Sequence, residues 1–219
     1  MNEPMYDAVN LPVLDWISKK ARRILDIGCG TGALGTRLKQ RQECFVLGVT
    51  HAAEEAALAR RSLDDALIQE LDALDLSPFP PFDCIVASHV LEHVSDPVRL
   101  LQVLQTHLAP GGELVIALPN VLHWRQRSLF LRGSFQYTEG GIMDRTHLRF
   151  FDWNSAHALL SQAGLRVVEA EATGNFPLPG IRRLFPSWAQ SIDTRAVSLW
   201  PGLFGFQFVF RCVVAQERA

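Results

Sequence analysis

A short run of glycines after an apolar strand is the feature of this sequence with the clearest chemical meaning. Residues 25–32 read LDIGCGTG, so a strand that carries one carboxylate, Asp26, runs into a loop and then into a helical pattern. Glycine allows the backbone to turn sharply and allows a ligand to approach it closely. The backbone around Gly28, Gly30 and Gly32 therefore predicts a small-molecule site at the end of this strand.

Two kinds of ligand fit such a loop. Gly30, Gly32 and Gly35 form a literal GxGxxG pattern, which is also found where NAD or a flavin dinucleotide binds. Asp26 opposes that interpretation, because a carboxylate repels a pyrophosphate but attracts a ligand with an ammonium group. The alternative for Asp26 is a turn residue that accepts hydrogen bonds from nearby amides.

Four further motifs accompany the loop: LDA at 71–73, FDCIV at 82–86, VLEHVSDP at 90–97 and LAPGGELVI at 108–116. In order and spacing, the five motifs together resemble the class I S-adenosylmethionine-dependent methyltransferases. The resemblance is close over residues 22–119 and looser up to residue 168. The following insertion is loosely similar to a bacterial small-molecule subgroup that includes the methionine-biosynthesis W-type proteins.

The resemblance implies a cofactor site for S-adenosylmethionine and the residues that hold it. Asp26 and the glycine loop would hold the amino-acid end of the cofactor, Asp72 would accept a hydrogen bond from the adenine amino group, and His89 would border the sulfonium. The full set is Asp26, Gly28, Gly30, Gly32, Thr50, Asp72, Ala73, Ser88 and His89.

Thr50 departs from the pattern of the class. These methyltransferases usually end the second strand with an acid that accepts hydrogen bonds from both ribose hydroxyls, whereas this strand ends with Thr50. Losing one such bond costs about 1–3 kcal/mol, or roughly 5- to 150-fold in affinity. The sequence leaves open a weaker site, compensation by Glu54 or Glu55, and a non-catalytic protein that binds the cofactor or a partner.

The segment 120–150 contains the candidates for acid–base chemistry. A hydroxyl acceptor gains from a general base near neutral pH, which histidine supplies, so His147 or His123 is the expected base, oriented by Asp144. Five arginines against two acids in this segment favour a small-molecule acceptor with an anionic group. The alternative is a set of internal ion pairs that fixes the loop.

Apolar runs and helical patterns alternate along the chain, which predicts an α/β fold of the Rossmann-like, doubly wound kind. With the resemblance, we expect a seven-stranded sheet, mostly parallel with an antiparallel last strand, and helices on both faces. We expect one domain over 1–219, with insertions on the substrate side at 120–150 and 174–205. Predicted strands are 23–27, 45–49, 67–71, 84–88, 114–118, 165–172 and 206–214; predicted helices are 34–41, 52–62, 97–108 and one begun by Asn154 or Ser155.

Composition narrows the class of protein. Of 219 residues, 48% are hydrophobic and 20% charged, as in a soluble protein with a substantial core. The formal charge of −2 gives no positive field for nucleic acid. The four cysteines show no CxxC spacing, so we expect no metal site and no disulfides. Without a signal peptide or membrane span in the sequence, we expect a cytoplasmic location.

A last segment, 176–204, mixes apolar side chains with three arginines. It is consistent with a lid, with a weak membrane-surface contact, or with a helix packed on the edge of the sheet. The sequence carries no signal for the oligomeric state.

Overall fold

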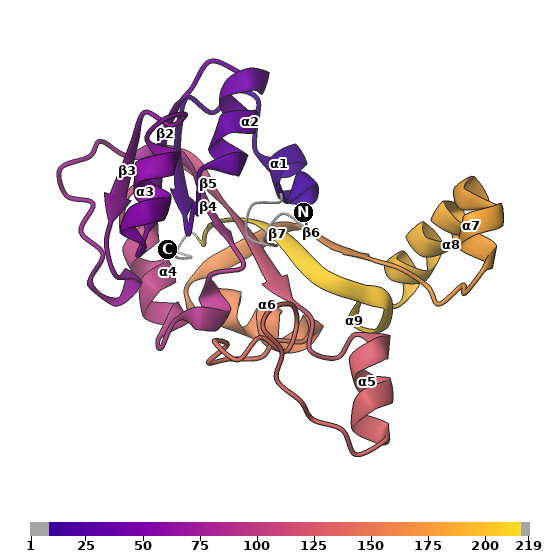
Figure 1. Cartoon of the computed structure of the whole chain (residues 1–219). Coiled ribbons are helices and arrows are strands. Elements are labelled where there is room, and N and C mark those ends of the chain that lie inside the picture. Colours follow the sequence, from indigo (N-terminus) through magenta and orange to yellow (C-terminus); the bar gives the residue numbers. More distant parts are fainter. Residues whose placement is uncertain (1–8, 216–219) are drawn as a thin grey trace.

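The computed structural model describes residues 9–215, which form a seven-stranded sheet in the order β3-β2-β1-β4-β5-β7-β6 (Figure 1). β7 is antiparallel to both of its neighbours, and the other pairs are parallel. The predicted fold is thereby confirmed. The strands are β1 Arg23–Ile27, β2 Phe45–Thr50, β3 Asp65–Ile68, β4 Phe82–Ser88, β5 Leu108–Pro119, β6 Leu165–Gly174 and β7 Gly205–Val214.

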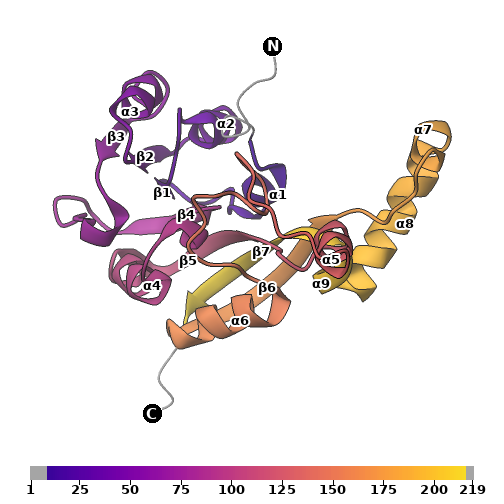
Figure 2. The ribbon, with the colours of Figure 1, turned by 60° about the horizontal axis from the view of Figure 1, so that its bottom comes forward.

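Helices cover both faces of the sheet because its central strands are apolar on both faces. In β1, Ile24 packs in a core shared with α1 and α2, whereas the next residue, Leu25, packs in the core shared with α4 and α6 (Figure 2). The helices are α1 Leu11–Trp16, α2 Ala33–Arg41, α3 Ala53–Ala59, α4 Pro97–Thr106, α5 Trp124–Leu131, α6 Trp153–Gln162, α7 Ile181–Leu184, α8 Pro186–Leu199 and α9 Pro201–Phe204, with the 3₁₀ turns η2 Leu71–Ala73 and η3 Leu91–His93.

The helix starts follow from capping side chains. The Asp96 carboxylate accepts a hydrogen bond from the Arg99 amide, so α4 begins where the Asp96–Pro97 pair predicts. The predicted start of α6 was wrong by one to two residues. Asp152 is its N-cap and accepts from the Ser155 amide, while the Ser155 hydroxyl accepts from the Asp152 amide, so Ser155 is the second half of a capping box.

Two details of the sheet differ from the sequence prediction. The third strand ends at Ile68, and residues 71–73 form η2. The fifth strand was predicted over 114–118, but β5 begins at Leu108 and includes the ProGlyGly stretch at 110–112. Along this stretch, pairing with β4 jumps from Leu108 to Glu113 and Gly111 has φ of 79°, so the extra residues bulge out of the strand.

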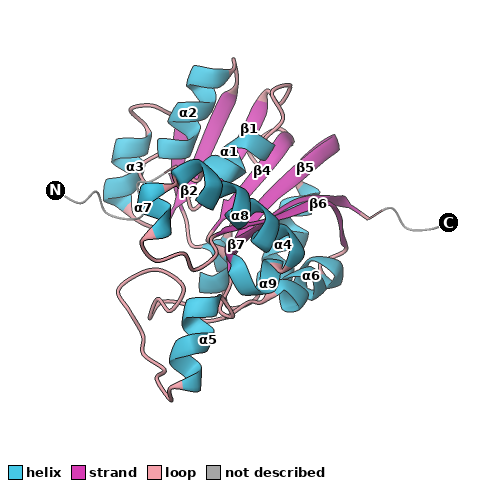
Figure 3. Cartoon of the chain, turned by 90° about the vertical axis from the view of Figure 1, so that its right-hand side faces the viewer, coloured by secondary structure: helices cyan, strands magenta, loops and turns pink. Residues whose placement is uncertain are grey.

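Both insertions contain helices, and in the second this agrees with one of the three alternatives, a helix packed on the edge of the sheet. α5 lies in the first insertion, beyond the end of the sheet (Figure 3). The second insertion forms α7, α8 and α9; α8 and α9 contact β6, and α7 with the start of α8 projects away from the sheet (Figures 1 and 2). Within residues 9–215, no helix is both long enough and apolar enough to cross a membrane.

Candidate cofactor and acceptor site

The glycine loop after β1 turns sharply and is tied to β2. Gly28, Gly30 and Gly32 all have positive φ, at 72°, 52° and 87°, a conformation that other L-residues rarely adopt. The Gly28 amide donates to the Val49 carbonyl at 2.8 Å. A Cβ atom on Gly28 would lie 2.6 Å from Cγ2 of Val90. The loop therefore needs glycine at this position for both its conformation and its packing.

Asp26 provides the strongest sign that a ligand belongs at this loop. Its side chain is buried, and Oδ2 has no hydrogen-bond partner among the described residues. Burial raises the pKa of this carboxyl to about 7. A buried carboxylate without a partner is costly, and a ligand ammonium group would offset that cost. The position therefore fits the amino-acid end of S-adenosylmethionine.

Thr50 lies at the carboxyl end of β2, beside the same loop. It is buried, and its hydroxyl donates to Oε2 of Glu55 at 2.5 Å. Glu55 is half-buried on the first turn of α3, whereas its neighbour Glu54 is exposed. The end of β2 carries no acid of its own, but the Glu55 carboxylate from the following helix forms a hydrogen bond there.

The residues expected near the adenine lie in η2. Both Asp72 oxygens lie within 3.1 Å of the Ser95 hydroxyl, which holds this exposed carboxylate in place. The Ala73 amide donates to the Glu70 carbonyl at 3.1 Å. Asp72 is thus oriented by the protein, and the Ala73 amide is used within its own turn.

Ser88 and His89 end β4 in a polar cluster that sequence reasoning did not find. His89 has φ of 55°, the only positive value among the described non-glycine residues, and its Nε2 lies 2.7 Å from the Gln207 side-chain oxygen. The Asn10 amide donates to the Ser88 hydroxyl at 3.1 Å and to Gln207 at 2.9 Å. Residues from the two ends of the chain therefore meet at the end of β4.

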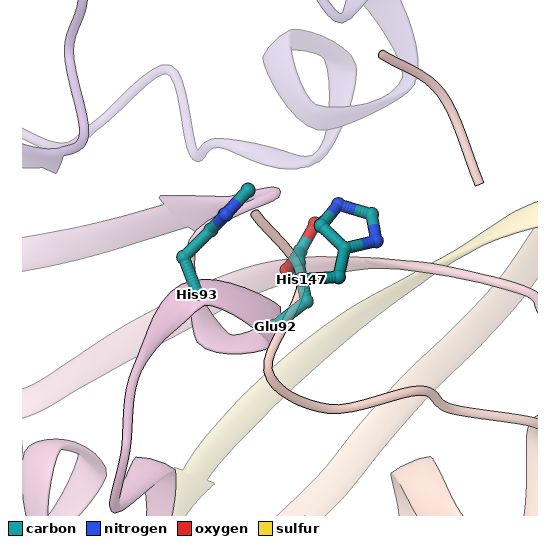
Figure 4. Close-up of side chains that lie close together, drawn as sticks. All are labelled: Glu92, His93 and His147. Atoms are coloured by element: carbon teal, nitrogen blue, oxygen red, sulfur yellow. The ribbon is translucent and has the colours of Figure 1, made fainter. Parts of the chain in front are cut away.

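Glu92 is a fully buried carboxylate beside this cluster, surrounded by imidazoles (Figure 4). Neither of its oxygens has a hydrogen bond within the described part of the chain. His89 Nδ1 lies 3.3 Å from Oε1, and His147 Nε2 lies 4.0 Å from it. Although burial by itself lowers the pKa of His89, Glu92 and Gln207 raise it above its ordinary value, which favours the protonated form of His89 beside this carboxyl group.

His147 enters this cluster from the insertion after β5. Its Nδ1 lies 3.2 Å from the Ile142 carbonyl, which assigns the ring proton to Nδ1 and leaves the lone pair on Nε2, toward Glu92. Burial lowers the pKa of His147 and outweighs the opposing effect of Glu92. The ring is therefore a free base at neutral pH.

Glu92, His93 and His147 also form the one group in residues 9–215 whose atoms could gather around a metal ion. Their ligand atoms all lie within 4.8 Å of one another. This group is not evident from the sequence, because its spacing is not that of a metal motif.

Asp144 adjoins the Glu92 cluster, because its carbonyl accepts from the His147 amide at 3.1 Å, whereas His123 is the N-cap residue of α5. Oδ1 of Asp144 accepts from the amide and the hydroxyl of Thr146, at 2.8 and 2.7 Å, and Thr146 in turn contacts His93. His123 is buried, its Nε2 has no partner among the described residues, and burial together with Arg125 lowers its pKa to about 4. The roles expected for both residues stay predictions.

A cavity of about 350 Å³ lies between α5 and the loop that carries His147. Ile142, whose carbonyl contacts His147, is one of its walls. The lining mixes polar and apolar side chains: His123, Arg125, Gln126, Leu129, Ser134, Gln136, Thr138, Ile142, Met143, Asn175 and Phe206. The cavity suits a small molecule with both polar and apolar parts.

Comparison with known proteins identifies the family of this chain. Residues 6–170 match the family described as "Methyltransferase domain". The chain is 35% identical over 123 residues to a ubiquinone biosynthesis O-methyltransferase of Xylella fastidiosa, covering 52% of this chain and 50% of that protein. It is 34% identical over 111 residues to a trans-aconitate 2-methyltransferase of Methylobacterium nodulans, covering 50% and 43%. The chain thus spans about half the length of the curated relatives it matches.

The fold has solved counterparts. An S-adenosylmethionine-dependent methyltransferase from Mesorhizobium loti aligns with a TM-score of 0.63 and 19% identity, covering 94% of this chain and 99% of that one. At this identity the likeness concerns the fold.

Proposed function

Because the chain belongs to the methyltransferase domain family, for which S-adenosylmethionine is the cofactor, we propose that it methylates a hydroxyl group of a small anionic molecule. The observation that carries the proposal is the pairing of two features at one end of the sheet. Asp26 is a buried carboxylate with an unpartnered oxygen at the glycine loop, and His147 is a free base held over Glu92 at the end of β4.

The cofactor half of the proposal rests on β1, β2 and β4. Asp26 binds the ammonium group, the backbone of Gly28, Gly30 and Gly32 allows close approach, and Asp72, held by Ser95, receives the adenine amino group. Thr50, Ala73, Ser88 and His89 complete the proposed lining. S-adenosylmethionine, when bound, supplies a methyl group already activated by the sulfonium, so the protein contributes mainly through positioning.

The acceptor half rests on His147. Its Nε2 would take the proton of the acceptor hydroxyl, and the cofactor would supply the methyl group to that oxygen as the methyl–sulfur bond breaks and S-adenosylhomocysteine leaves. The Glu92 carboxylate, 4.0 Å from Nε2, stabilises the imidazolium that results. His123 is the second candidate base, and Asp144 supports the loop through Thr146.

The cavity beside His147 favours an acceptor with an anionic group. Arg125 contributes a guanidinium to its lining, and Gln126, Gln136 and Asn175 contribute amides. The two relatives differ in substrate: one is named for ubiquinone biosynthesis and the other for trans-aconitate. A phenol that carries a carboxylate combines the hydroxyl and the negative charge that these side chains would recognise.

A turnover assay tests the proposal. S-adenosylhomocysteine formation is measured with phenols that do or do not carry a carboxylate, and with trans-aconitate. We expect turnover with a carboxylated phenol, and a loss of at least about 100-fold in kcat for His147→Ala with unchanged affinity for S-adenosylhomocysteine. An unchanged kcat in this variant would contradict the role of His147.

Thr50 supports a second candidate, a non-catalytic protein that binds the cofactor. Its hydroxyl is occupied by Glu55, and no acid ends β2. This candidate predicts binding of S-adenosylhomocysteine without turnover on any acceptor, so the same assay separates it from the first.

We also propose that the projecting arm formed by α7 and the start of α8 touches a membrane surface. Its tip exposes Leu184, Phe185 and Trp188, each more than half exposed. Residues 175–205 contain three arginines and one acid, Asp193, which is paired with Arg182. Exposed aromatic and aliphatic side chains beside arginine suit the headgroup region of an anionic bilayer.

Vesicle sedimentation tests the arm. The wild type should sediment with vesicles rich in phosphatidylserine and less with phosphatidylcholine alone, and the Leu184→Ser/Trp188→Ser variant should stay in the supernatant. Leu131→Ser changes an 89% exposed leucine at the end of α5 and is the matched control. Equal sedimentation of all three proteins would refute the contact.

We also propose that the protein works in the reducing cytoplasm, because its four cysteines are free.

A further inference from the structure

We propose that Glu55, held in place by Thr50, binds the ribose hydroxyls of the cofactor. In the class that the chain resembles, an acid at the end of the second strand does this, and the strand here ends with Thr50. The inference rests on the cofactor site proposed above and not on the acceptor.

Thr50 is in the right place for the ribose but has the wrong chemistry. The preceding residue, Val49, accepts hydrogen bonds from the Gly28 and Cys29 amides, so the end of β2 adjoins the glycine loop. The Thr50 hydroxyl donates its one hydrogen to Glu55 and accepts, at 3.3 Å, from the Ala52 amide. It has little remaining capacity for two ribose hydroxyls, which need acceptors.

Glu55 has that capacity. A carboxylate offers about four lone-pair sites, of which the Thr50 hydroxyl takes one. Because the bond from Thr50 is 2.5 Å long, the Glu55 carboxylate lies within one hydrogen bond of the strand end. The side chain comes from the neighbouring helix instead of the strand, yet it brings the same chemical group to the same edge of the sheet.

The Glu55 carboxylate lies close enough to the glycine loop for its charge to act on a residue of that loop. Burial raises the pKa of the Cys29 thiol, and the charges of Asp26 and then Glu55 raise it further. Cys29 sits between Gly28 and Gly30 in the glycine loop. Glu55 and Asp26 therefore act on the same loop residue, as expected if they hold two parts of one ligand.

The position of Glu55 in its helix is not that of an ordinary cap. A glutamate at the third residue of a helix commonly accepts from the amide of the N-cap residue. Here the N-cap is Ala52, and Glu55 instead accepts from Thr50, two residues further back. The side chain reaches past the start of α3 toward the strand end.

Calorimetric titration with S-adenosylhomocysteine and its 2′-deoxy analogue tests the proposal. The wild type should prefer the ribose ligand by about tenfold, the effect of one lost hydrogen bond. Glu55→Ala should weaken binding of the ribose ligand about tenfold and bring the preference below about twofold. Glu54→Ala is the matched control, because Glu54 is the exposed neighbour on the same turn; it should bind like the wild type.

A second variant separates ribose binding from folding. Thr50→Asp combined with Glu55→Ala restores an acid at the strand end and should recover both affinity and preference for the ribose. An undiminished preference in Glu55→Ala would overturn the role of Glu55 while leaving the cofactor site intact. Absence of binding by the wild type would instead overturn the cofactor site itself.

Discussion

Replacing Asp26 by asparagine should stabilise the ligand-free protein at neutral pH and abolish cofactor binding. Asp26 is buried, its Oδ2 has no partner among the described residues, and burial raises its pKa to about 7 from an ordinary 3.8. Ionisation of this carboxyl thus costs folding free energy unless a ligand cation is present. Asparagine has the same shape without the charge.

The size and sign of the effect follow from linkage. Because the pKa is raised in the folded state, the stability contributed by this group is present at low pH and is lost as pH rises from about 4 to about 7. Between pH 5 and pH 7, the wild type should lose about 2.3 kcal/mol, at up to 1.36 kcal/mol per pH unit. The loss slows near pH 7, where the carboxyl is half ionised, and is nearly complete by about pH 8.

Urea unfolding at pH 5, 6, 7 and 8 measures this difference. The free energy of unfolding of Asp26→Asn, relative to the wild type, should rise by about 2.3 kcal/mol from pH 5 to pH 7 and by less than about 0.5 kcal/mol more at pH 8. A difference that does not change with pH would refute the argument that Asp26 is an unpaired buried acid. In titrations at pH 7.5, the variant should lose S-adenosylhomocysteine binding; undiminished binding would remove Asp26 from the site.

Two further predictions concern the loop and the base. Gly28→Ala should destabilise the protein by about 1–3 kcal/mol and weaken cofactor binding, because φ is 72° and the new Cβ meets Val90 at 2.6 Å. Gly133→Ala is the control, because Gly133 has a similar φ of 74° but open space around it. This control variant should lose only about 1 kcal/mol of stability. If the two variants melt alike, packing at Gly28 is not the reason for the glycine. Since burial lowers the pKa of His147, kcat should stay level from neutral pH to below pH 6.5, the ordinary value, and then fall; an acid limb centred above 6.5 would argue against His147 as the base.

The parts of the fold that sequence could predict are those set by local pattern. Apolar strands such as 23–27 and the Asp96–Pro97 helix start depend on neighbours in the chain, and the structure reproduces them. Whether 176–204 forms a helix on the edge of the sheet was left open among three alternatives, because prolines and glycines interrupt the segment and its apolar side chains lack a regular helical spacing.

In the candidate site, too, the residues set by local sequence could be predicted, whereas those set by packing could not. Asp26 and the glycine loop could be predicted because they form one short run of consecutive residues. The choice between Glu54 and Glu55 could not be made from the sequence. Only packing distinguishes those two, since one faces Thr50 and the other faces solvent. Glu92 was missed for a related reason: its burial arises from contact with His89 and with His147, which comes from the far insertion.

The most direct test of the account is a calorimetric titration of the purified protein with S-adenosylhomocysteine and, separately, with NAD. We predict saturable one-to-one binding of S-adenosylhomocysteine, lost in Asp26→Asn, and no heat with NAD. Binding of NAD, or no binding of S-adenosylhomocysteine, would contradict it.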